Sequence, residues 1–102
     1  MDPLEQARQL FFEALAHQQG HRLVQAEALY RQALALAPDR VSILVNLSAV
    51  LVTQHRFAEA LPFCRRALEL EPDHPDARQH LTLCEHDAQA GDDPLARLDR
   101  EL

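Results

Sequence analysis

Residues 33–39 read Ala-Leu-Ala-Leu-Ala-Pro-Asp, and residues 67–73 read Ala-Leu-Glu-Leu-Glu-Pro-Asp. The second stretch repeats the first, with both leucines, the proline and the aspartate in the same places. The offset that carries Ala33 to Ala67 also carries Ala26 to Ala60. A shared offset at so many positions indicates that the chain is built from an internal structural repeat.

Small residues recur at equivalent places in the two copies, where two helices of a hairpin must approach closely. They are Ala14, Ala26, Ala33, Ser48, Ala60 and Ala67. Large residues are expected to fill the spaces between them: Leu10, Leu23, Tyr30, Leu44, Phe57 and Leu68. A single hairpin cannot bury its apolar face, so each pair of helices must stack on a neighbour.

Capping and helix-breaking residues predict where the helices begin and end. Asp2, Pro3 and Glu5 provide an N-cap acceptor, a proline at the first helical position and a glutamate at the third. Pro38 and Pro72 end the second helix of each pair. We expect helices over about 3–18, 23–36, 40–53, 57–70 and 75–90, the third capped by Asp39 and the fifth by Asp73 or His74. Gly91 is expected to stop the fifth helix, and Asp92-Asp93-Pro94 to cap a further short segment.

The second copy reads Leu44-x2-Leu47-Ser48-x2-Leu51, then Ala60-x3-Cys64, Ala67 and Pro72. With its 34-residue period it resembles the tetratricopeptide repeat (TPR) family. The resemblance covers about residues 7–90. It implies an all-α fold, a right-handed α-solenoid of antiparallel helix hairpins. The repeats would span about 7–40 and 41–74, with a capping helix at about 75–90 and an acidic tail or short sixth helix at 91–102.

Two features of the sequence conflict with a regular repeat. Glu13 stands where the family pattern has a buried leucine, with Phe12 one residue earlier, and Gly20 stands one residue ahead of the turn position of His55. The first helix is therefore either in register, or rotated by one residue with Phe12 inward and one extra residue in the first turn. We prefer the in-register reading. Pro62 falls inside the fourth helix, where it should remove a hydrogen bond and kink the chain.

Composition excludes several classes of function. The 102 residues are 47% hydrophobic and carry a net charge of −6, with ten arginines and no lysine. There is no basic stripe for nucleic acid, no Gly-rich phosphate loop and no apolar run long enough to cross a membrane. The acidic N-terminus does not resemble a signal peptide. We expect a cytoplasmic, non-enzymatic protein without a cofactor.

Histidines and cysteines at helical spacing are the alternative candidates for chemistry. His17 and His21 are four residues apart, as are His80 and Cys84. This spacing could reach one zinc ion, but no larger zinc-binding pattern accompanies it, so no metal is expected. Cys64 and Cys84 should lie on helices in contact. A disulfide between them is conceivable, although reduced thiols suit the cytoplasm better.

The resemblance implies that a protein or peptide partner binds a concave face lined by the first helix of each pair. An apolar strip is expected there, with Val45 and Val52 not needed by the core. The candidate groove residues are Phe11, Leu15, Gln18, Val45, Asn46, Ala49, Val52, Gln79, Leu83 and His86. The leading hypothesis is a protein-interaction module holding a helical or extended peptide. The alternatives are an accessory N-terminal domain of a larger bacterial enzyme, of glycosyltransferase or methyltransferase type, and a self-associating structural piece.

Overall fold

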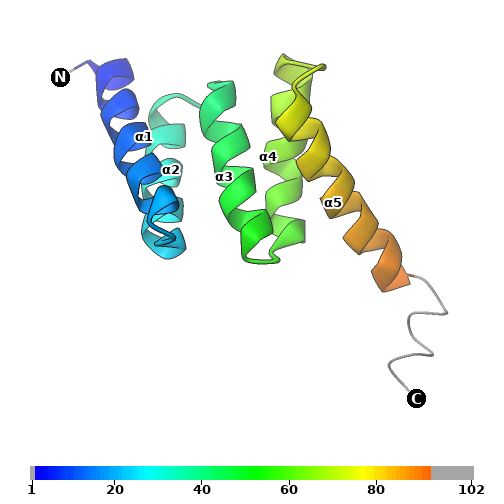
Figure 1. The fold of residues 1–102 in the computed structure, drawn as a ribbon. Coiled ribbons are helices and arrows are strands. Elements are labelled where there is room, and N and C mark those ends of the chain that lie inside the picture. Colours follow the sequence, from blue (N-terminus) through cyan, green and yellow to red (C-terminus); the bar gives the residue numbers. More distant parts are fainter. Residues whose placement is uncertain (1, 93–102) are drawn as a thin grey trace.

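Five α-helices, packed sequentially as adjacent pairs, form the part of the chain that the structure describes. This computed structural model describes residues 2–92, with side chains through Asp87. The helices are α1 (Pro3–Gln19), α2 (Leu23–Leu36), α3 (Val41–Thr53), α4 (Phe57–Leu70) and α5 (Pro75–Asp92). Figure 1 shows α1, α3 and α5 in one layer, with α2 and α4 behind them. The all-α prediction is confirmed for these residues.

The two hydrogen bonds that close the turn of the first hairpin recur at equivalent positions in the second. The N–H of Arg22 donates to the carbonyl of His17 at 2.8 Å, and the N–H of His21 donates to that of Gln18 at 3.0 Å. These two bonds form a Schellman motif, which satisfies the last carbonyls of a helix. The corresponding bonds of the second turn run from Arg56 to Leu51 at 2.9 Å and from His55 to Val52 at 2.9 Å.

His21 and His55 both have a φ of 59°, the left-handed conformation that this turn requires. The two turns are therefore equivalent, and no extra residue is inserted in the first. Phe12 is exposed and Ala14 is completely buried. These positions confirm the in-register placement of the first helix and contradict the rotated one.

The helix boundaries agree closely with the sequence prediction, and two of the three predicted caps are present. The Asp2 side chain accepts a hydrogen bond from the N–H of Leu4 at 3.2 Å, and the His74 ring accepts one from Ala77 at 3.3 Å. The cap predicted for Asp39 is wrong. Arg40 is the N-cap residue of α3 and makes no side-chain capping bond. Asp39 instead pairs with Arg66 on α4 at 2.7 Å.

Two other local expectations need correction. Helix α4 is continuous through Pro62, whose ring lies on the exposed side. Helix α5 continues through Gly91 to Asp92 rather than ending at about residue 90. Of the acidic tail or short sixth helix predicted at 91–102, the part after Asp92 lies outside the described residues.

The core follows the small–large pattern of the sequence. All six small residues predicted at helix contacts are completely buried: Ala14, Ala26, Ala33, Ser48, Ala60 and Ala67. Tyr30 and Leu44 are buried between them, while Leu10, Leu23, Phe57 and Leu68 are half-buried at the edges. Close approach of the paired helices thus depends on alanine and serine at these positions.

The neighbouring hairpins do not meet in the same way along the layer of first helices. Helix α5 packs directly on α3, whereas a groove opens between α1 and α3. Phe11 and Ile43 stand at this groove, while their counterparts one repeat later are the smaller Val45 and Ala77. Since larger side chains at a contact hold helix axes further apart, these residues account for the groove.

Candidate interaction surface

A row of apolar side chains crosses the layer formed by α1, α3 and α5. Leu15, Ala49 and Leu83 occupy the same position in three successive copies of the repeat. Leu15 and Ala49 are half-buried, and Leu83 is 42% exposed. Because equivalent positions on stacked hairpins face the same way, the three side chains present an accessible apolar row.

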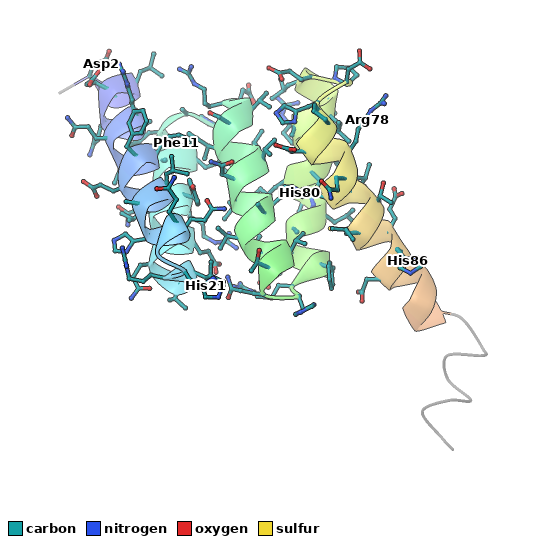
Figure 2. The ribbon with its side chains drawn as sticks, viewed as in Figure 1. Asp2, Phe11, His21, Arg78, His80 and His86 are labelled. Atoms are coloured by element: carbon teal, nitrogen blue, oxygen red, sulfur yellow. The ribbon has the colours of Figure 1, made fainter. Side chains whose placement is uncertain are left out.

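The groove between α1 and α3 lies beside this row, at the N-terminal ends of the two helices. Its volume is about 460 Å³. Ala7 and Ile43 are buried at its base, and Phe11 is half-buried on the side of α1 that faces α3 (Figure 2). The rim carries the exposed side chains of Leu4 and Phe12. The groove therefore has an apolar base and an apolar rim.

Sequence reasoning missed most of this groove. It selected Phe11 but placed Leu4, Phe12 and Ile43 outside the candidate site. The available signal was the pair of bulky residues Phe11 and Ile43, at positions where the next repeat carries smaller ones. That difference in size indicates a wider gap between the first helices of the first and second hairpins.

The assignment of Val45 to an exposed groove is wrong. Its side chain is only 4% exposed and packs with Leu44, Ala67 and Ala77. The reason is that α5 lies directly against α3 and covers this position. Val52 is half-buried against the core and is likewise not free of it.

The remaining candidates on α5 lie at the surface. Gln79 and His86 are exposed. Figure 2 shows His86 near the C-terminal end of the helix. They lie one helical turn before and after Leu83 on α5, so polar groups border this end of the apolar row.

Gln18 and Asn46 are each tied through one polar atom of the side chain to the buried Tyr30. The Tyr30 hydroxyl donates to Oε1 of Gln18 at 2.5 Å and accepts from Nδ2 of Asn46 at 3.3 Å. Burial raises the pKa of Tyr30, while the bond from Asn46 acts in the opposite direction. This chain of bonds links α1, α2 and α3 and fixes the floor beside Phe11, whose ring centroid lies 5.8 Å from that of Tyr30.

Ser48 and His80 form a close pair between α3 and α5. The Ser48 hydroxyl donates to the carbonyl of Val45 at 2.7 Å and lies 2.8 Å from Nδ1 of His80. Since the serine has one proton to donate, His80 must carry a proton on Nδ1 and donate it. Burial lowers the pKa of His80, an effect partly opposed by Asp76.

This serine–histidine pair lacks the access that nucleophilic catalysis needs. Ser48 is completely buried, so a substrate carbonyl cannot approach its hydroxyl. Figure 2 shows His80 pointing from α5 toward the other helices. The pair joins α3 to α5 and so holds these two helices in place relative to each other.

Cys64 and Cys84 are both free thiols and both buried. Burial raises the pKa of each thiol, and that of Cys84, which also lies beside Cys64, reaches about 12. Thiolate is the reactive form of cysteine, so these thiols are poor nucleophiles. They fill space in the core as small apolar groups.

Two other kinds of site are absent from the described residues. Within residues 2–92, no helix is long and apolar enough to cross a membrane. The described part of the chain also contains no group of three or more His, Cys, Asp or Glu side chains placed to hold a metal ion.

No protein-family model matches this chain, and no curated protein matches it either.

Proposed function

We propose that the chain is a TPR-like right-handed α-solenoid that acts as a non-enzymatic protein-interaction module. It binds a helical or extended peptide across the layer of α1, α3 and α5. The observation that carries this proposal is the row of Leu15, Ala49 and Leu83, an accessible apolar residue at one repeat position in three successive helices. The turn bonds of the first hairpin, which recur one repeat later in the second, support the repeat architecture.

Burial energetics explain why such a row favours binding. An accessible leucine contributes little to folding, whereas covering it in a complex contributes about 1.5 kcal/mol or more. Leu83 lies on α5 with no further described helix over it. The polar neighbours Gln79 and His86 flank it and provide hydrogen-bonding groups at the edge of a bound peptide.

Site-directed photo-crosslinking in the native cell tests this proposal. A photoreactive amino acid is placed at Leu15, at Leu83 or at Val24, which is 72% exposed on α2 in the other layer. We expect positions 15 and 83 to capture the same protein and position 24 not to capture it. A peptide from the captured segment should then bind the purified chain, and Leu15→Glu with Leu83→Glu should weaken binding about tenfold or more.

Two results would contradict the proposal. One is equal capture at position 24. The other is that the captured peptide binds the Leu15→Glu, Leu83→Glu double variant as tightly as the wild type but binds the Val24→Glu variant more weakly. The Val24→Glu variant is the matched control, because it adds the same charge at another exposed apolar position.

A further inference from the structure

The N-terminal half of α1 carries an exposed apolar face that the proposed peptide row does not use. Leu4, Arg8 and Phe12 follow one another at intervals of four residues and therefore lie on one side of the helix. Leu4 and Phe12 are each 53% exposed, and both border the groove between α1 and α3. The guanidinium of Arg8 lies 5.8 Å from the centre of the Phe12 ring. Two large apolar groups on one short face mark it as a contact surface.

The charges on this face are of both signs, and none of them forms an ion pair with another described residue. Asp2, Glu5, Arg8 and Arg40 line the groove, so its formal net charge is zero in a chain of net charge −6. Four other arginines form ion pairs with acidic side chains: Arg31, Arg56, Arg66 and Arg78. Among the described residues, neither Arg8 nor Arg40 has a carboxylate within ion-pair distance.

The order of these charges along α1 is self-complementary. Glu5 lies at the start of the helix, and Arg8 follows about 4.5 Å further along its axis. If two copies of α1 lie antiparallel, with a two-fold axis near this point, Glu5 of each copy meets Arg8 of the other. A face with one sign of charge would repel its own copy, whereas this one attracts it twice.

We infer that a second copy of this chain covers the face, with the two α1 helices antiparallel. Leu4 and Phe12 supply the apolar anchors, and two reciprocal Glu5–Arg8 ion pairs set the register. The inference goes beyond the proposed function and uses separate residues, since Leu15, Ala49 and Leu83 do not line the groove.

Charge reversal in the full-length chain tests this contact. In sedimentation equilibrium, the mass of the wild type should rise toward twice the chain mass of 11.6 kDa as the protein concentration is raised to about 100 µM. Arg8→Glu and Glu5→Arg should each weaken association about tenfold or more, since each creates two like-charge pairs. Both side chains are exposed, so circular dichroism should show unchanged helix content in each variant.

Mixing the two variants gives the decisive result. Arg8→Glu paired with Glu5→Arg places opposite charges at both contacts, so the mixture should form a heterodimer with about wild-type affinity. The inference is overturned if the wild type is monomeric throughout this range. It is also overturned if either variant alone associates as tightly as the wild type, or if the mixture stays monomeric. Photo-crosslinking at positions 15 and 83 tests the peptide surface independently of this outcome.

Discussion

The hairpins α1–α2 and α3–α4 share one backbone design but differ in what covers them. Their turn hydrogen bonds match at equivalent repeat positions, down to a left-handed histidine in each. Yet Phe11 remains half-buried while Val45, its counterpart, is 4% exposed. The difference lies outside the hairpins: α5 covers one side of α3, whereas a groove separates α1 from α3.

Equivalent positions in the two copies of the repeat therefore need not have the same role. The same backbone position packs the core in the second hairpin and borders a groove in the first. A residue's role therefore depends on its distance from the next hairpin, which the side chains at that contact determine. Substitutions at counterpart positions of the two hairpins test this difference.

Placing a charge at each of the two counterpart positions should separate their roles. Val45→Asp buries an unpaired carboxylate and should lower the free energy of unfolding by about 3 kcal/mol or more. Phe11→Asp should cost about 1–2 kcal/mol, because the carboxylate reaches water in the groove and only the contacts of a half-buried ring are lost. Urea unfolding followed by circular dichroism measures both values. Equal losses would mean that the groove is closed in solution.

Enlarging the buried alanines should affect the two hairpins alike. Ala26 and Ala60 are counterparts and are both completely buried. Changing either to leucine overpacks a helix contact and should cost about 1–3 kcal/mol, measured by thermal unfolding. Ala58→Leu, at an exposed position of α4, is the control and should leave stability nearly unchanged. A loss confined to one hairpin would show that the two pairs do not pack in the same way.

The smallest effect concerns pH and His80. Its pKa in the folded chain is lower than the ordinary 6.5, so the unfolded chain takes up the proton first as the pH falls. The stability contributed by neutral His80 is complete above pH 6.5 and is lost progressively below it. Asn46 is the counterpart of His80 one repeat earlier. His80→Asn therefore introduces a residue that the repeat already has at this position, and it removes the titrating group.

Urea midpoints of the wild type and of His80→Asn, measured between about pH 7 and pH 5, check this prediction. The wild type should lose more stability over this range than the variant does. The other described histidines are common to both proteins, so their contributions cancel in the difference. Parallel pH profiles would show that the pKa of His80 is the same in the folded and the unfolded chain.

Most of the helix boundaries could be predicted because their signals are local. Proline after each second helix, the Asp2 cap and the His74 cap act within a few residues of the helix end. Asp39 failed as a cap because Arg66, distant in the sequence, holds its carboxylate. The Gly91 stop failed because one glycine costs a helix only about 1 kcal/mol, which continued helix formation can offset.

The repeat, the five helices and the buried alanines could be predicted from the sequence, since the period and residue size are properties of the chain. Which positions of the first helices meet solvent depends on how the helices pack in three dimensions. Val45 is buried because Ala77 lets α5 approach α3, and the groove is open because Phe11 and Ile43 keep α1 and α3 apart. The spacing between helices depends on pairs of side chains far apart in sequence, and no local pattern encodes such a pair.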